Sequence, residues 1–167
     1  MADDEPTVLK AIVSETESRS KAVRDEFLEE VSTSLLHYAQ SFGMHSLSKA
    51  QLRGNANLLL VKGGADTSFS KVTKGERLRL KVATVLAMIQ VGERRSIGRH
   101  PGLIMIDSPA AQEVAPEDLR GLLSGLTVVR EELPHLQIFV AGITSAAMGE
   151  FIPPNRRKEA SDGGYLW

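Results

Sequence analysis

The sequence contains no cysteine, which excludes disulfide bonds and thiolate metal sites. Aromatic residues make up only 5% of the 167 residues, and no apolar run approaches the ~20 residues needed to cross a bilayer. The absence of cysteine fits a reducing compartment. The acidic start, residues 1–5, differs from the basic and then apolar start of a signal peptide. We therefore expect a cytoplasmic protein with no membrane partner.

The sequence also lacks a phosphate-binding loop of the form Gly-x-x-x-x-Gly-Lys-Ser/Thr. Residues 63–67 contain two glycines and a hydroxyl, but Lys62 precedes this turn and does not substitute for the missing lysine. The net charge of −1 gives no general electrostatic case for nucleic acid. The four histidines show no metal-site spacing. A hydrophobic content of 42% and a charged content of 25% are ordinary for one globular domain.

Apolar residues recur at spacings of three and four between Pro6 and Gln40, which predicts a long helix that stops near Gly43. This stripe consists of Val8, Ile12, Val23, Phe27, Val31, Leu35 and Tyr38. Residues 14–21 have no apolar side chain, so we expect that part of the helix to be exposed. Such a helix would be ~50 Å long. It fits either a broken pair of helices or the root of a longer coiled coil.

The rest of the chain alternates apolar runs with helical patterns. Short apolar runs predict strands over residues 57–62, 68–72, 103–107 and 137–141. A helical pattern covers residues 75–91, which are apolar almost all round and are therefore expected at the centre of the domain. A second one covers residues 115–133, where Pro116, Glu117 and Asp118 suit a first turn, because proline needs no donor there and carboxylates favour the positive end of the helix dipole. This alternation predicts an α/β fold with a mostly parallel sheet flanked by helices.

Asp107 ends a fully apolar strand and stands just before a proline. A buried strand that ends in a carboxylate at the edge of a parallel sheet is a typical Mg²⁺-binding arrangement in nucleotide-binding proteins. The alternative is a structural Asp that caps a turn or the next helix. The position by itself leaves both interpretations open.

Thr73 and Gly75 open the helix predicted over residues 75–91. A hydroxyl, a glycine and the first amides of a helix form an anion site, because the unpaired N–H groups and the helix dipole point the same way. Thr73 and Glu76 also have the three-residue spacing of a capping box. The two interpretations are compatible, since a well-capped helix start can also hold a phosphate.

Together, these segments resemble the C-terminal lobe of an ATP-binding-cassette head of the SMC-like group, the coiled-coil ATPases of chromosome maintenance and DNA repair. Residues 72–77 (Val-Thr-Lys-Gly-Glu-Arg) are similar to the signature motif, usually Leu-Ser-x-Gly-Glu/Gln-Lys/Arg in that group. Residues 103–109 are similar to the Walker B strand, and residues 137–141 to the strand before the switch residue. The resemblance covers residues 55–144, and the long first helix corresponds to the end of the returning coiled-coil arm.

The resemblance implies a division of labour between two heads. Asp107 would hold Mg²⁺ and its water network beside a phosphate loop carried by an N-terminal Walker A lobe, in the same chain or another. Thr73, Lys74, Gly75 and Glu76 would contact the γ-phosphate of ATP held by the opposite head of a homo- or heterodimer. The implied cofactors are ATP and Mg²⁺, and DNA is an implied partner of the full complex.

The sequence departs from the family pattern after the Walker B strand. The family normally has a Glu directly after the Walker B Asp to polarise the attacking water, whereas this chain has Ser108. A serine needs an activator to act as that base at neutral pH. Glu113 is the candidate substitute, and the D-loop Asp and the switch His of the family are also absent. Hydrolysis is therefore slow, differently organised or lost.

These observations predict half of a P-loop ATPase head with a long N-terminal helix. Residues 1–43 are expected to form the base of a coiled-coil arm, residues 44–150 the C-terminal lobe, and residues 151–167 a loosely held tail. The expected function is to supply the signature motif and the Walker B Asp for ATP-dependent head dimerisation and hydrolysis in a DNA-processing, repair or defence complex. ATPase activity is expected only when a Walker A lobe completes the head.

Two other functions remain open at this stage. The first is a non-catalytic protein-binding module with a degenerate nucleotide site, which the serine at position 108 favours. The second is an unrelated α/β enzyme that uses Asp107 at a strand end, as receiver-type domains do. Receiver-type domains usually have additional acidic ligands near the first strand, and the sequence places none there.

Overall fold

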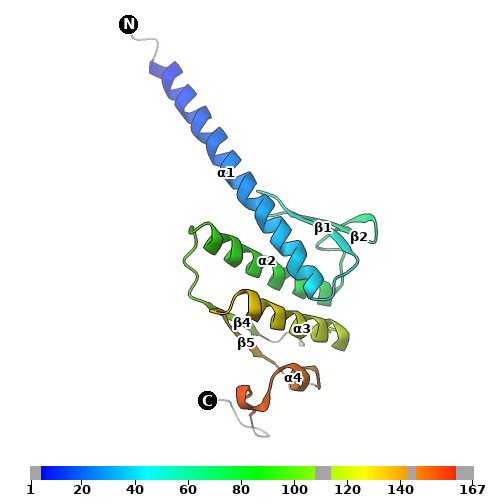
Figure 1. Cartoon of the computed structure of the whole chain (residues 1–167). Helices are drawn as coiled ribbons and strands as arrows, with labels where there is room; N and C mark the ends of the chain where they lie inside the picture. The colour runs from blue at the N-terminus through cyan, green and yellow to red at the C-terminus, as the bar shows by residue number, and fades with distance from the viewer. Residues whose placement is uncertain (1–4, 108–113, 143–145, 161–167) are drawn as a thin grey trace.

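The computed structural model describes residues 5–107, 114–142 and 146–160 (Figure 1). The candidate residues Ser108 and Glu113 lie outside this part of the chain. A long helix projects from a body made of two small sheets and the remaining helices (Figure 1). None of the helices in the described part is long and apolar enough to span a membrane.

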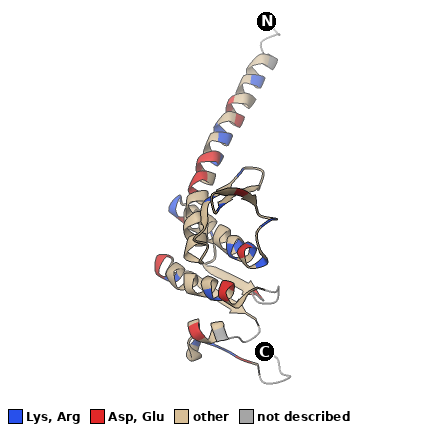
Figure 2. Cartoon of the chain, turned by 90° about the vertical axis from the view of Figure 1, so that its right-hand side faces the viewer, with Lys and Arg blue, Asp and Glu red and all other residues tan. Residues whose placement is uncertain are grey.

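The projecting helix, α1 (Glu5–Ser41), is one unbroken helix of 37 residues, so the alternative of a broken pair is wrong. Its apolar stripe behaves differently in its two halves. Val31, Leu35 and Tyr38 are fully buried in the body, whereas Val8 and Val23 are 54% and 62% exposed. Residues 14–21 are exposed, as predicted. Acidic and basic residues are interspersed along the outer half (Figure 2).

An antiparallel sheet of three strands packs beside the second half of α1. It consists of β1 (Leu47–Leu52), β2 (Leu58–Lys62) and β3 (Ala65–Ser68), in that order. Its buried residues Leu47, Ala50 and Leu60 join the core of α1. The sheet is held to α1 by hydrogen bonds as well: the amide of Leu52 donates to the Ser32 hydroxyl at 3.0 Å.

The strand predicted at residues 57–62 is confirmed, with a tight turn at Gly63 and Gly64. Both glycines have positive φ (59° and 79°), which a two-residue hairpin turn requires and glycine adopts without strain. The strand predicted over residues 68–72 is wrong, because β3 ends at Ser68 and the chain then turns toward the next helix. Strand β1 was not predicted, since only Leu47 and Ala50 of its six residues are buried.

Helix α2 (Lys74–Arg94) lies against α1 and supplies the centre of the core through Leu80, Ala83 and Leu86. Helix α2 is not buried on every side as expected, because Val85 and Met88 on one side are about half exposed. At the far end of α2, Arg95 forms 2.7 Å ion pairs with both Glu26 and Glu30 of α1. These bonds raise the pKa of Arg95 and fix the end of α2 to the point where α1 leaves the body.

Strands β4 (Leu103–Asp107) and β5 (Gln137–Ala141) pair in parallel, as predicted, with Asp107 opposite Ala141. Helix α3 (Pro116–Glu132) connects them, as a parallel pair requires. One face of this sheet packs on the helices, with Ile106 in the same buried cluster as Leu122.

The other face of the parallel sheet is open. Leu103, Met105 and Phe139 are 42%, 76% and 57% exposed, and we call these three side chains the open sheet face. The buried strand expected at residues 103–107 is therefore buried on one face only, because none of the described elements covers the other face. Beyond the sheet, α4 (Ala146–Phe151) packs on α3, and a short 3-10 turn at Pro154–Arg156 follows.

Candidate functional site

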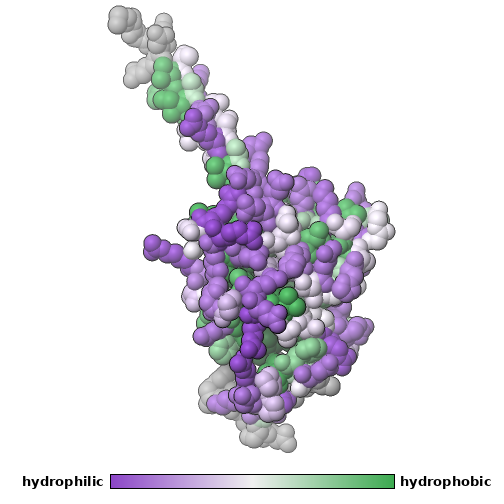
Figure 3. Space-filling view, in the orientation of Figure 1, coloured by the Kyte–Doolittle hydropathy of each residue, from purple (hydrophilic) through white to green (hydrophobic). Residues whose placement is uncertain are grey.

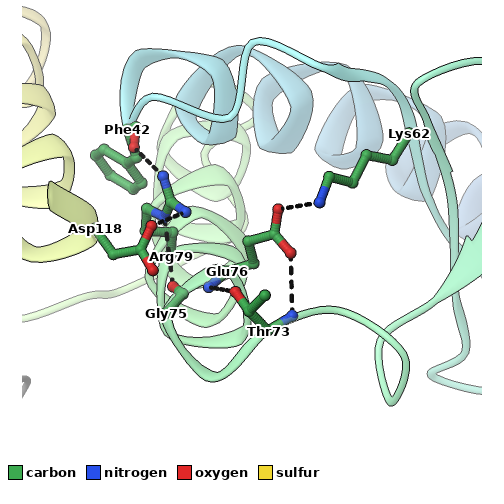
Figure 4. Close-up of polar contacts among 7 residues, drawn as sticks. All are labelled: Phe42, Lys62, Thr73, Gly75, Glu76, Arg79 and Asp118. Carbon is green, nitrogen blue, oxygen red and sulfur yellow. Dashed lines mark hydrogen bonds and ion pairs between the residues drawn. The ribbon is translucent and has the colours of Figure 1, made fainter. Parts of the chain in front are cut away.

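The turn that opens α2, residues 73–76, is a complete capping box (Figure 4). The amide of Glu76 donates to the Thr73 hydroxyl at 3.1 Å, and the amide of Thr73 donates to the Glu76 carboxylate at 3.0 Å. Both hydrogen bonds of the predicted capping box are thus present. They satisfy two of the N–H groups that the start of a helix leaves without a partner inside the helix. We refer to residues 73–76 as the α2 turn.

The carboxylate of Glu76 is buried and engaged within the chain. One of its oxygens lies 2.6 Å from the ammonium of Lys62, at the end of β2, and the other accepts from Thr73 (Figure 4). Burial alone raises the pKa of Glu76, but the bonds from Lys62 and Thr73 outweigh it and hold the pKa below its usual value. Glu76 is therefore ionised at neutral pH and ties the antiparallel sheet to the start of α2.

The pKa shift predicts a pH-dependent stability effect for Glu76→Gln. A carboxyl whose pKa is lowered on folding stabilises the protein above its unfolded pKa of about 4.5, and this stabilisation is lost as the pH falls through the folded pKa. The substitution is expected to reduce the free energy of unfolding by about 1.5–3 kcal/mol at pH 7, because it weakens hydrogen bonds to a charged group. The difference should be smaller at pH 3, which lies below the unfolded pKa, because the stabilisation by the charged carboxyl declines as the pH falls below about 4.5.

Urea unfolding at the two pH values measures this difference. Glu15→Gln is the matched control, because the Glu15–Arg19 pair on α1 is exposed and should contribute less than about 1 kcal/mol at either pH. A Glu76→Gln effect of equal size at both pH values would show that the charge of Glu76 contributes nothing.

The α2 turn adjoins the first turn of α3. A Cβ atom on Gly75 would lie only 1.9 Å from a carboxylate oxygen of Asp118, so no larger residue fits at this position unless Asp118 moves. Asp118 belongs to the acidic first turn of α3, which begins with Pro116 as predicted. The glycine predicted to face a nucleotide therefore also has a packing role within the chain.

A buried arginine, Arg79, connects the α2 turn and the first turn of α3 to the end of α1 (Figure 4). Arg79, which is 7% exposed, donates to the carboxylate of Asp118 and to the carbonyl of Phe42, the latter at 3.1 Å. Its Nε also donates to the carbonyl of Gly75, at 3.4 Å. One guanidinium thus contacts the end of α1, the α2 turn and the start of α3.

The surface around the α2 turn is basic. Lys71, Lys74 and Lys81 are exposed near the start of α2, and Arg77 is partly exposed. Positive side chains, the first amides of a helix and the helix dipole all favour an anion at the same place. These features favour a phosphate at the α2 turn, and the two carboxylates at the turn, Glu76 and Asp118, are paired with Lys62 and Arg79.

Asp107 is exposed at the carboxyl end of β4, at the last pair of the parallel register. Within the described residues, no group of three or more acidic or histidine side chains is placed to hold a metal ion. Mg²⁺ in nucleotide sites typically takes one or two carboxylates together with waters and substrate phosphates. A single exposed carboxylate fits that donor set, so Asp107 is suited to be the protein's ligand to Mg²⁺ or to its water shell.

Asp107 and the α2 turn could be identified from the sequence, but the side chains that hold the turn could not. Lys62 and Arg79 were missed, because their partners are 14 and 39 positions away along the chain. The only signal for Arg79 was its position between two leucines, Leu78 and Leu80, because a charged side chain that is buried requires a partner. The acidic first turn of α3 was interpreted as complementing the helix dipole, and its contact with Arg79 was not predicted.

The chain has the fold of part of an SMC head domain. It aligns with the SMC head domain of Thermotoga maritima with a TM-score of 0.51 and 16% identity, covering 72% of this chain and 40% of that one. A Pyrococcus furiosus Smc head with an extended coiled coil, bound to the C-terminal domain of ScpA, aligns with a TM-score of 0.59 and 14% identity, covering 87% of this chain and 36% of that one.

A third structure, an SmcHead bound to the C-winged helix domain of ScpA, aligns with a TM-score of 0.52 and 11% identity, covering 74% of this chain and 37% of that one. The chain thus spans less than half the length of the three head structures. No protein-family model and no curated protein matches it.

Proposed function

We propose that this chain is the C-terminal lobe of an SMC-like ATPase head, completed by a lobe that carries the Walker A loop. The observation that carries the proposal is the open sheet face next to Asp107. Parallel sheets are almost always covered on both faces, and a sheet of two strands is only marginally stable by itself. A parallel pair with Met105 and Phe139 exposed on one face has the properties of part of a larger sheet.

In the completed head, Asp107 acts at the Mg²⁺ of the nucleotide held by the Walker A lobe. When bound, Mg²⁺ would supply positive charge beside the phosphates, and the Asp107 carboxylate would hold the ion or its water shell in place. Asp107 is the described residue with a strand-end carboxylate suited to that role. Ser108 and Glu113 follow it along the chain, and Glu113 is the proposed substitute for the family's catalytic Glu.

The α2 turn acts on the nucleotide of the opposite head. Thr73, Lys74 and Gly75 present a hydroxyl, a basic side chain and the first backbone amides of α2 to the γ-phosphate. Glu76 contributes indirectly, because its carboxylate bonds Lys62 and Thr73 and so fixes the shape of the turn. ATP then joins two heads, and its hydrolysis separates them.

Helix α1 is the base of a coiled-coil arm in this proposal. Exposed Val23, Ile12 and Val8 lie farther out on α1 than the buried Val31 and Leu35, with the polar residues 14–21 between Ile12 and Val23 (Figure 3). These exposed apolar side chains suit a second helix packed along α1. The Pyrococcus structure, which has an extended coiled coil, covers 87% of this chain, against 72% for the Thermotoga head. That larger coverage supports the assignment of α1 to the arm.

The proposal also includes protein and DNA partners. Two of the similar heads were solved with a domain of ScpA bound, so we expect a protein that binds the assembled head. DNA is expected as the substrate of the whole complex, in chromosome handling, repair or defence. A cytoplasmic location follows from these roles.

Substitution of Asp107 by Asn tests the proposal. The chain is mixed with a Walker A lobe from an SMC head, and ATP–Mg²⁺-dependent association of the assembled heads is measured by light scattering. Asp107→Asn is expected to raise the Mg²⁺ concentration needed for half-maximal association roughly 10- to 100-fold. The reason is that it removes a charged group proposed to accept hydrogen bonds from the ion's waters. Asp66→Asn is the control, because Asp66 lies on β3, away from the parallel sheet.

If the wild-type heads assemble but ATP does not affect their association, the α2 turn serves only as a helix cap. The non-catalytic binding module then becomes the better description. If Asp107→Asn needed the same Mg²⁺ concentration as wild type, Asp107 would not act at the ion. The assignment of the chain as a C-terminal lobe would be unaffected.

A further inference from the structure

Arg79 lies where three parts of the molecule meet, and one side chain bonds all three. It donates to the carbonyl of Phe42 at the end of α1, to the carbonyl of Gly75 in the α2 turn, and to Asp118 in the first turn of α3 (Figure 4). The side chain of Arg79 is 8% exposed and that of Asp118 is 19% exposed, so solvent screens their ion pair only weakly.

The backbone packing at this point leaves little freedom for the three parts to move separately. A Cβ atom on Gly75 would collide with Asp118, and one on Gly121 of α3 would lie 2.8 Å from the carbonyl oxygen of Phe42. A close-packed contact of this kind passes a displacement of one element to the next instead of absorbing it. The α2 turn, the start of α3 and the end of α1 therefore form one rigid junction.

We infer that Arg79 is a positioning residue that couples the first turn of α3 to the α2 turn and to the base of the arm. Helix α3 is the element that follows the Asp107 strand along the chain, whereas the α2 turn faces the opposite head in the proposed function. The Arg79–Asp118 pair thus connects the part of the lobe beside its own nucleotide with the part that meets the partner's nucleotide. The nucleotide readout of this inference rests on the proposed function.

The test must separate coupling from simple loss of folding, because removing one partner of a buried pair leaves an unpaired charge. The informative variant is therefore the double substitution Arg79→Met/Asp118→Leu. Replacing a buried ion pair by apolar residues of similar volume is often neutral or stabilising, so this variant is expected to keep its thermal midpoint within a few degrees of wild type. Arg120→Gln is the matched control, since it removes the half-exposed ion pair between Arg120 of the same helix and Glu150 of α4.

The first measurement is amide hydrogen exchange of the chain without nucleotide. In the double variant, the amides of residues 74–79 are expected to exchange about tenfold faster than in wild type. A tenfold change corresponds to an interaction free energy that is typical of residues in one hydrogen-bonded network. Arg120→Gln should leave these amides unchanged. Exchange at the wild-type rate in a folded double variant would overturn the inference, whatever the chain does with ATP.

The second measurement uses the heads assembled with the Walker A lobe. In the double variant, ATP-dependent association of the heads is expected to weaken about tenfold, while association of the chain with the Walker A lobe stays unchanged. Wild-type affinity between the heads in the double variant would overturn the coupling to the nucleotide. If the wild-type heads show no ATP-dependent association, it is the proposed function that fails, and the exchange measurement alone decides on Arg79.

Discussion

Replacing both Met105 and Phe139 by Asp is expected to weaken association with the Walker A lobe by roughly 1,000-fold. Burial of one such side chain contributes about 1.5–3 kcal/mol, so the two together contribute about 4 kcal/mol, and two uncompensated charges at the interface would add to the loss. Because Met105 and Phe139 are 76% and 57% exposed, the chain itself should still fold, although the two Asp side chains would lie opposite each other in the parallel pair and lower its stability by roughly 1 kcal/mol. Titration calorimetry with the Walker A lobe measures the affinity, and circular dichroism checks the fold.

Val128→Asp is the control for a general effect of surface charge. Val128 is 37% exposed on α3, which packs on the other face of the parallel sheet. This variant should bind the Walker A lobe as wild type does. If the doubly substituted chain still bound with wild-type affinity, the open sheet face would not be the contact surface for that lobe.

The largest loss of stability is expected for Phe42→Ala, at about 3–5 kcal/mol. The Phe42 ring is fully buried where α1 ends, and α3 approaches it so closely that a Cβ on Gly125 would lie 2.2 Å from the ring. Removing the ring leaves a cavity between two helices that the backbone can close only in part. The loss would be a large share of the 5–15 kcal/mol typical of a whole domain.

Phe27→Ala provides the comparison within the same helix. The Phe27 ring is only partly buried, in a groove beside Val23 and Ile97, so its removal should cost clearly less. Urea unfolding of both variants gives the two free energies. If the two variants lost equal free energies of unfolding, packing at the end of α1 would stabilise the protein no more than packing at the middle of the same helix.

The parallel part of the fold could be predicted from the sequence because its signals are local. The runs at Leu103–Asp107 and Gln137–Ala141 were located to the residue, and Pro116 marked the start of the helix between them. The capping box at Thr73 and Glu76 was likewise visible from a spacing of three residues. Each of these features is determined by side chains within one turn or one strand.

The contacts that hold the site together could not be predicted in the same way. Lys62, Arg79 and Asp118 come from three elements, and only the packing of those elements shows which charges meet. Strand β1 was missed for a related reason, since its few buried residues gain their partners from α1 and β2 and not from a local pattern.

The open sheet face is the most informative disagreement between sequence and structure. The sequence of β4 is apolar on both sides, which is typical of a strand buried on both faces. The structure buries Ile106 and exposes Met105. The proposed function accounts for this difference, because a Walker A lobe would cover the second face.

The anchoring of α1 has a mechanical consequence. Arg95 holds the helix at Glu26 and Glu30, and from there the free part extends to Glu5, a span of about 30 Å at 1.5 Å per residue. Because the helix is held at one end only, a tilt of about 10° at Glu26 and Glu30 would move Glu5 by roughly 5 Å. Sub-ångström adjustments near Arg95 would thus be magnified many times over at the distal end of the molecule.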